Sequence, residues 1–141
     1  MVKRRKHGYL EALRDHRLPI DRDLVLCGKI DFDEARQATL QLLQSEKRPD
    51  AILAFNDIIT YAAFDAIKAC GLRIPDDVAI IGFTDGDSAA FVTPKLSAIM
   101  DQAHEQGFKS CELLLRHIGG DLHIYREIIP MILKIRESSE K

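Results

Sequence analysis

The sequence predicts an α/β protein built on an open parallel sheet with helices on both faces. Residues 51–55 and 78–81 are almost uninterrupted apolar runs, which is typical of strands that are covered on both sides. Residues 57–71 between them follow helical spacing and end at a glycine. A strand, a helix and a second strand in this order indicate parallel strands joined by a right-handed crossover. Because ligands bind outside the carboxyl ends of such strands, the same unit predicts where a binding site lies.

The segment before this unit is expected to contribute two helices and a short strand. Apolar residues at helical spacing predict a helix over residues 5–16, and the apolar run at residues 24–27 predicts a strand. Asp31 followed by Glu34 has the pattern of a capping box, so we expect a second helix to begin there. Asp57 is the expected N-cap of the helix that follows the first long strand.

The C-terminal part continues the alternation of strands and helices. Residues 96–100 are expected to be extended, residues 102–118 to be helical, and residues 126–135 to form a final strand. One side of the predicted helix is apolar and carries Phe108, Cys111, Leu114, Leu115 and Ile118.

Composition indicates one ordinary globular domain and excludes several other classes of protein. The 141 residues are 46% hydrophobic and 30% charged, which argues against disorder. The net charge of −2 does not favour a nucleic-acid-binding surface. No apolar run approaches the roughly 20 residues that cross a membrane, and no apolar signal region follows the basic start. The three cysteines are widely spaced, which favours reduced thiols and a cytoplasmic protein over a metal site.

Polar residues stand where the two apolar strands end. Asn56 and Asp57 follow the first strand, and Thr84 and Asp85 follow the second. A carboxamide and a carboxylate at one sheet edge can hydrogen-bond neighbouring hydroxyl groups, as a sugar or nucleoside requires. For Asp57 alone, helix capping is the better explanation. For Asn56 together with Asp85, contact with a ligand is the better one.

The usual catalytic patterns are missing from the sequence. It contains no phosphate-binding glycine loop, no HExxH and no GxSxG. Asp57, Asp85 and Asp87 form an acidic group that can also be interpreted as a Mg²⁺ site for phosphoryl transfer. Without a glycine loop this interpretation is the weaker one, so we expect no enzyme, no catalytic residue, no metal and no cofactor.

Several short motifs together resemble the effector-binding core of the lactose-repressor family of bacterial transcriptional regulators. Their order and spacing cover residues 5 to about 118, and the set is specific although each motif alone is weak. The matching pieces are Arg5-Lys6-His7-Gly8-Tyr9 with Ala12-Leu13, Pro49-Asp50-Ala51-Ile52-Leu53-Ala54-Phe55-Asn56-Asp57, Gly71-Leu72-Arg73-Ile74-Pro75-Asp76-Asp77-Val78, Ile81-Gly82-Phe83 and Thr93-Pro94-Lys95-Leu96-Ser97-Ala98-Ile99.

The resemblance implies a fold like that of periplasmic sugar-binding proteins, in which a small effector, expected to be a sugar, lies between two lobes. It also implies that Arg5 and Asn56 reach the effector and that Phe32 offers an aromatic platform. Family members often have aspartate directly after G-[FY], where this chain has Thr84 followed by Asp85. Either Asp85 takes over that role or the effector differs.

The resemblance further divides the chain. It implies that residues 1–98 are the C-terminal lobe without its first strand, that residues 99–120 are a crossover and a helix of the N-terminal lobe, and that residues 121–141 are a final strand and tail. The missing strand is expected between residues 24–27 and 51–55. The chain is therefore expected to be a truncated regulator that is poorly stable alone or recruits a strand from a partner.

Operator DNA would be bound only by a helix-turn-helix domain absent from this sequence, and the full-length protein is expected to be a homodimer. The alternative that shares this fold is the solute-binding protein of a sugar transporter.

Overall fold

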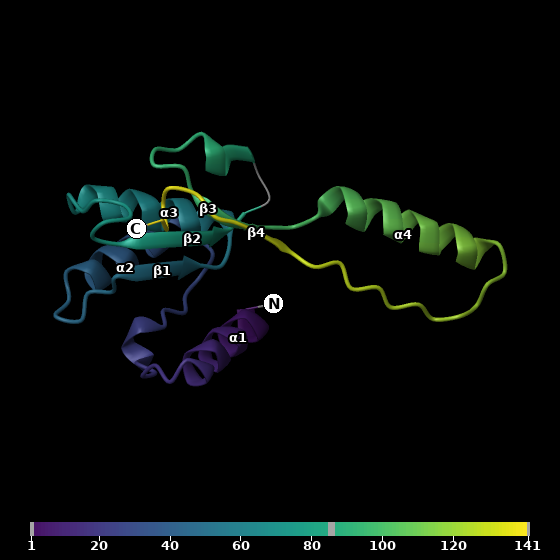
Figure 1. Cartoon of the computed structure of the whole chain (residues 1–141), viewed down its shortest axis with the longest axis horizontal. Helices are drawn as coiled ribbons and strands as arrows, with labels where there is room; N and C mark the ends of the chain where they lie inside the picture. The colour runs from purple at the N-terminus through teal and green to yellow at the C-terminus, as the bar shows by residue number, and fades with distance from the viewer. Residues whose placement is uncertain (1, 85–86, 141) are drawn as a thin grey trace.

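The computed structural model describes residues 2–84 and 87–140, and it divides into a body and a projecting arm (Figure 1). The body holds most of the helices and strands, whereas the arm consists of α4 and the segment that returns from it. In chain order the elements are α1 (Val2–Asp15), the 3-10 turn η1 (Arg22–Leu24), α2 (Phe32–Leu43), β1 (Ala51–Ala54), α3 (Asp57–Ala69), β2 (Ala79–Phe83), the 3-10 turn η2 (Asp87–Ala90), β3 (Ser97–Met100), α4 (Ala103–Ile118) and β4 (Ile132–Lys134).

The described strands form one open sheet in the order β1-β2-β3-β4. β1, β2 and β3 are parallel, and β4 returns antiparallel to β3. The predicted α/β class with an open, mostly parallel sheet is therefore confirmed. β4 runs the other way because the chain leaves the sheet along α4 and doubles back beside it.

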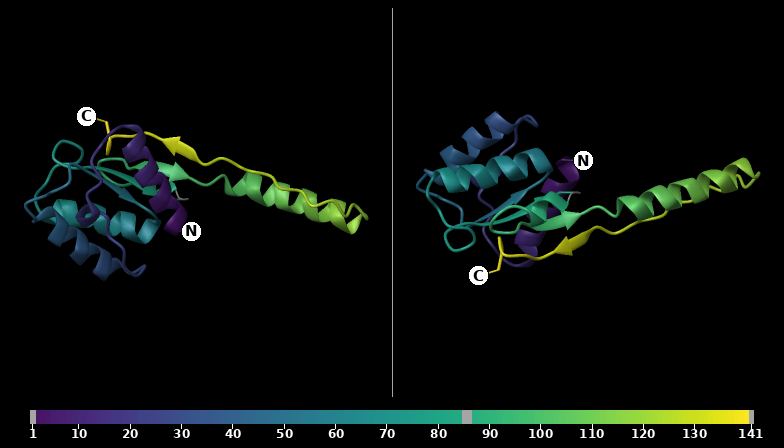
Figure 2. Two further views of the ribbon diagram at one scale, coloured as in Figure 1. Left: turned by 90° about the horizontal axis from the view of Figure 1, so that it is seen from below. Right: turned by 90° about the horizontal axis from the view of Figure 1, so that it is seen from above.

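One face of the sheet is covered by α3, with α2 packed outside α3, as Figure 2 shows. Gly82 in β2 marks the closest approach, because a Cβ atom added there would lie 2.3 Å from the Cγ2 atom of Thr60 on α3. Ile67 on α3 and Ile80 on β2 are completely buried in this layer. Each such side chain contributes about 1.5–3 kcal/mol by leaving water, so this layer holds the body together.

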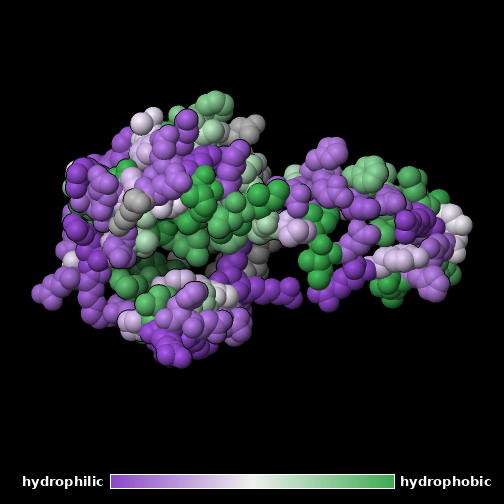
Figure 3. Space-filling view, viewed as in Figure 1, coloured by the Kyte–Doolittle hydropathy of each residue, from purple (hydrophilic) through white to green (hydrophobic). Residues whose placement is uncertain are grey.

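No helix among the described residues packs as a layer on the opposite face of the sheet, so the expected helices on both faces are found on one face only. Side chains alternate along a strand, and the strand register aligns the outward rows of neighbouring strands. These rows define the open face, whose large apolar members are half-buried or exposed: Leu53, Ile81, Phe83, Ile99 and Leu133. Ser97 in the same rows is buried by its hydrogen bonds to the C-terminal segment. Figure 3 looks onto this side and shows apolar side chains gathered over the strands.

The predicted strand at residues 24–27 is also wrong. Its first residue ends η1, and residues 25–29 have no regular structure. β1 is the edge strand on this side of the sheet, and residues 25–29 do not pair with its free edge. Helix α1 lies beyond this free edge (Figure 1).

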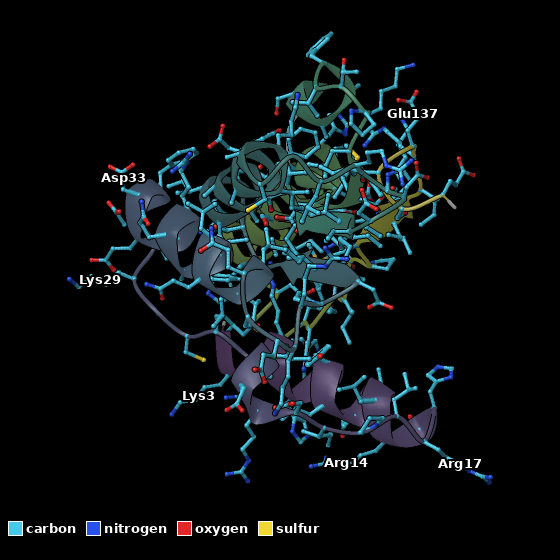
Figure 4. All side chains as sticks on the ribbon, turned by 90° about the vertical axis from the view of Figure 1, so that its left-hand side faces the viewer. Lys3, Arg14, Arg17, Lys29, Asp33 and Glu137 are labelled. Carbon is cyan, nitrogen blue, oxygen red and sulfur yellow. The ribbon has the colours of Figure 1, made fainter. Side chains whose placement is uncertain are left out.

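Most basic side chains of the N-terminal segment are exposed to solvent. Lys3, Arg14 and Arg17 point away from the body in Figure 4. Arg5 is the exception among the arginines of α1, because it is half-buried against the sheet.

The arm, residues 101–131, is held together by its own polar contacts. At its base, the side-chain amide of Gln102 donates to the carbonyl oxygen of Pro130 at 2.7 Å. At its tip, the Tyr125 hydroxyl donates to Asp121 at 2.7 Å, and the Arg116 guanidinium lies 5.7 Å from the centre of the Tyr125 ring. The predicted helix at 102–118 is confirmed as α4. The predicted strand at 126–135 is reduced to β4, because residues 122–131 run beside α4 and not beside a strand.

Candidate functional site

The candidate site lies at the edge of the sheet where β1 and β2 both end. Ala54 of β1 pairs with Gly82 of β2, so the residues that follow each strand emerge at the same edge. Helix α3 begins there as well, directly after β1. The site that the sequence predicts at the carboxyl ends of parallel strands thus corresponds to a real junction of two strands, a helix N-terminus and the side chain of Arg5.

Arg5 connects α1 to this edge. Its guanidinium donates a hydrogen bond to the carbonyl oxygen of Phe55, at the end of β1. The same group lies 3.9 Å from the centre of the Phe83 ring, at the end of β2. A guanidinium has five N–H donors in a rigid fork, so one bond to a carbonyl leaves others for a ligand. The aromatic face fixes the orientation of the cation.

Asn56 has two polar ends, and one of them is already used. Its Oδ1 atom accepts a hydrogen bond from the backbone N–H of Ile59 at 2.9 Å, which makes Asn56 the N-cap of α3. The prediction that Asp57 caps this helix is therefore wrong. The backbone of Asn56 is extended and the helical turn starts one residue later, so the cap falls on Asn56. No hydrogen bond within the described part of the chain uses its Nδ2 donors.

Asp57 is the first residue of α3, and its Oδ1 atom has an unusual environment. Among the described residues, this oxygen is buried and has no hydrogen-bond partner. A carboxylate in the first turn of a helix is favoured by the helix dipole, but a buried acceptor without a donor costs about 1–3 kcal/mol. This edge therefore holds an acceptor that lacks a donor from the rest of the described chain.

The other predicted site residues are placed less centrally or lie outside the described residues. Thr84 follows β2 and is 3% exposed, and its backbone N–H donates to the carbonyl oxygen of Ile99 at 3.2 Å. Phe32 opens α2 and is 41% exposed. Asp85 lies outside the described residues, and so does the predicted pairing of Asn56 with Asp85.

Sequence reasoning missed the role of Phe83 and of the Phe55 carbonyl. The alternation of side chains along a strand could have placed Phe83 on the same face as Ile81, two residues earlier. No sequence pattern could have identified the Phe55 carbonyl, because every strand end offers a main-chain acceptor. This one binds Arg5 only because α1 lies beside it.

Metal chemistry has little support at this edge. Within the described ranges, no group of three or more His, Cys, Asp or Glu residues lies close enough to hold a metal ion. The clearest displaced pKa values occur elsewhere on the surface: hydrogen bonds from Lys47 lower the pKa of Asp21, and hydrogen bonds from Arg73 lower the pKa of Asp77. No helix among residues 2–84 and 87–140 has the length and apolar character to span a bilayer.

Comparison with known proteins places this arrangement in a family. Residues 2–139 match the family described as periplasmic binding protein-like domain. The HTH-type transcriptional repressor PurR of Aliivibrio salmonicida is 34% identical over 92% of this chain, which spans 38% of that protein. The probable HTH-type transcriptional repressor ExuR of Bacillus subtilis is 39% identical over 69% of this chain, and the match covers 29% of that protein.

Solved structures agree with these matches. A regulatory protein of the LacI family from Chloroflexus aggregans superposes with a TM-score of 0.87 at 37% identity, over 96% of this chain and 50% of that one. The complex of the transcriptional regulator CelR with cellobiose gives a TM-score of 0.84 at 29% identity, over 96% and 42% of the two chains. This chain therefore spans half or less of each of these four proteins.

Proposed function

The chain belongs to the family of LacI-type transcriptional regulators as part of their periplasmic-binding-protein-like effector domain, and on this premise we propose that its strand edge forms one wall of an effector site. The effector is a polyhydroxylated small molecule, a sugar or a related compound. Arg5 and Asn56 donate hydrogen bonds to it, and Asp57 accepts one. Thr84 borders the same wall. Asp85 and Phe32 are kept in the proposal as the sequence predicts them, Asp85 as a further acceptor and Phe32 as an aromatic surface for the ligand.

The observation that carries this proposal is the fixed position of Arg5. A cation from α1 is held against Phe83 and the Phe55 carbonyl, next to Asn56. Neighbouring hydroxyl groups need donors and acceptors within a few ångströms of one another, and this edge offers both. The unpartnered Oδ1 atom of Asp57 supports the proposal further, because a ligand hydroxyl is a donor that would satisfy it.

Related regulators have been solved with sugars, which supports a hydroxyl-rich ligand. CelR was solved with cellobiose, and a LacI family regulator from Lactobacillus casei was solved with sucrose and with glucose at 25% identity to this chain. For this chain we propose the class of hydroxyl-rich ligands and no particular sugar. Repression of genes through operator DNA, by a homodimer carrying separate DNA-binding domains, completes the proposal for the whole regulator.

A solute-binding protein of a sugar transporter remains the other function for this fold. The four relatives described above are transcriptional regulators, and this favours the regulator.

Binding is tested by thermal unfolding and calorimetry with glucose, sucrose, cellobiose and adenosine as probes. At least one probe is expected to raise the melting temperature of the chain. Asn56→Asp keeps the Oδ1 acceptor that caps α3 but removes the Nδ2 donors, so it should weaken binding about tenfold while the cap is retained.

The matched control is Asp31→Ala on α2, where Asp31 is the N-cap that accepts from the Glu34 N–H at 2.9 Å. It should lower stability by about 1 kcal/mol, the usual cost of losing an N-cap, without changing binding. If Asn56→Asp binds every stabilising probe as tightly as the unaltered chain, the proposed wall is wrong.

A further inference from the structure

Arg5 keeps its positive charge at the candidate site, because both groups that hold it are uncharged. Its guanidinium donates to the carbonyl oxygen of Phe55 and lies 3.9 Å from the centre of the Phe83 ring. Neither group neutralises a cation as a carboxylate does. No ion pair among the described residues includes Arg5, whereas Arg36 and Arg73 each pair with a carboxylate. The edge of the sheet therefore presents a cation in a defined position.

The surroundings of Arg5 strengthen its attraction for an anion. Its side chain is half-buried against the sheet, and charges interact more strongly where water is partly excluded. The planar fork of a guanidinium also matches two oxygens of a carboxylate or a phosphate. Hydrogen bonds between charged groups are roughly twice as strong as those between neutral groups. A neutral hydroxyl group gains neither the charge nor the paired geometry.

The helix that carries Arg5 adds positive charge around it. Residues 3–6 are four consecutive basic residues, and the first acidic residue of α1 is Glu11. The other three are exposed, and Lys3 points away from the body in Figure 4. They lie within one helical turn of Arg5, inside the screening length of about 8 Å at physiological salt. They therefore attract an anion towards this edge without contacting it.

The other polar groups of the edge require a ligand that carries hydroxyl groups as well. Within the described part of the chain, the Nδ2 donors of Asn56 are unused and the Oδ1 atom of Asp57 has no donor. An anionic group accepts hydrogen bonds but has no proton to donate to Asp57, and its charge is repelled by this carboxylate. A hydroxyl group is able to donate. Asp57 therefore suits a part of the ligand away from its charge.

We propose that the effector is anionic: a hydroxyl-rich small molecule that bears a carboxylate or a phosphate group. Arg5 binds the charged group through its remaining N–H donors, and Asn56 and Asp57 bind hydroxyl groups of the same molecule. This inference rests on the proposed function, because it assigns a charge to the ligand of the same wall. A sugar acid and a sugar phosphate share the chemistry that Arg5 recognises.

The test compares sugars that differ in one group, by calorimetric titration of the 141-residue chain. Glucuronate and galacturonate carry a carboxylate where glucose and galactose carry a hydroxymethyl group, and glucose 6-phosphate carries a phosphate there. At least one anion is expected to bind at least tenfold more tightly than its neutral counterpart. Added salt should reduce this preference, since it screens the charges. The ratio between the carboxylate and the phosphate identifies the source of the charge.

A substitution of Arg5 tests whether this side chain causes the preference. Arg5→Met should weaken the binding of the anion at least tenfold and that of the neutral sugar less, so that the preference is lost. A purely structural loss would weaken both sugars alike. Arg14→Met is the matched control, because it also removes a positive charge from α1 but at an exposed position that points away from the body. It should retain the preference.

Each contrary result has a distinct meaning. A neutral sugar that binds as tightly as its anionic counterpart, and that Asn56→Asp weakens, would overturn the anionic effector and leave the proposed wall intact. No binding by any probe would overturn both. A preference that survives Arg5→Met would overturn the role of Arg5. Acetate and inorganic phosphate lack the hydroxyl groups of a sugar, so binding of either as tight as that of the best sugar would overturn the hydroxyl-rich class.

Discussion

The two faces of the sheet differ strongly in how far their side chains are buried, although the same strands form both. Ile80 and Ile81 are neighbours in β2 and the same residue type, yet Ile80 is completely buried under α3 and Ile81 is only partly covered. Nothing in the strand distinguishes them except the side to which each points. Burial in a sheet is therefore decided by what packs on it, and the apolar pattern of a strand shows only what the strand is able to bury.

The same lesson applies to the two polar residues at the N-terminus of α3, the N-cap Asn56 and the first helical residue Asp57. Asn56 and Asp57 are adjacent, and both have side chains that cap helices. Asn56 has a partner within the chain for its oxygen, whereas the Oδ1 atom of Asp57 has none among the described residues. The oxygen of Asn56 is therefore used within the fold, whereas the Oδ1 atom of Asp57 finds no donor in the part of the chain that the structure describes.

The largest expected effect separates the two faces directly. Ile80→Ala should lower the free energy of unfolding by about 3–4 kcal/mol, because it leaves a cavity under α3. Ile81→Ala should cost about 1 kcal/mol in dilute solution. Urea unfolding followed by circular dichroism measures both. Equal losses at low concentration would contradict the contrast between the faces. A loss for Ile81→Ala that grows with protein concentration would show that the open face becomes covered.

The next effect tests how closely α3 approaches β2. Gly82→Ala places a methyl group 2.3 Å from Thr60 Cγ2, so the helix must shift, and a loss of about 2–3 kcal/mol is expected. Adding Thr60→Ser, which removes that methyl group, should recover part of it. The control is Gly107→Ala in α4, where nothing lies within 4 Å and the helix should gain about 0.5–1 kcal/mol. If Gly82→Ala proves neutral, the layer is looser than the structure indicates.

A smaller effect concerns the link between α1 and the sheet. Arg5→Met removes the hydrogen bond to the Phe55 carbonyl and the stacking on Phe83, and it should cost about 1 kcal/mol. Hydrogen exchange should become faster in residues 2–15 and stay unchanged in α3. Lys3→Met, an exposed position on the same helix, is the control. Equal protection of α1 in both variants would show that other contacts hold it.

The smallest effect is the response to acid of the turn before β2. Hydrogen bonds from the side chain and the backbone of Arg73 lower the pKa of Asp77. A carboxyl group whose pKa is lower in the folded state stabilises the fold above its unfolded pKa of about 3.9, and this contribution is lost as pH falls through the folded value. Asp77→Asn should therefore lower the melting temperature slightly at neutral pH and reduce its decline below about pH 4. An unchanged acid slope would contradict this role.

Part of the site could be found from the residues alone. The strand–helix–strand unit fixed the edge, since parallel strands place their carboxyl ends together, and Asn56 was identified from its position after the first strand. Its capping role was assigned to Asp57 because both residues suit an N-cap, and only the path of the backbone chooses between them. Phe83 was hidden because its function depends on Arg5, which is 78 positions away in the sequence.

The amino-acid sequence by itself determined the elements with strong periodicity: α2, α3, α4 and the apolar strands β1 and β2. It also determined the α/β class, because local spacing and chain order carry that information. Tertiary structure alone decided that residues 24–27 stay unpaired, that only one face of the sheet is covered, and that α4 projects into solvent. These outcomes depend on which neighbour is present to pair or pack, and a strand or a helix does not encode the presence of its neighbour.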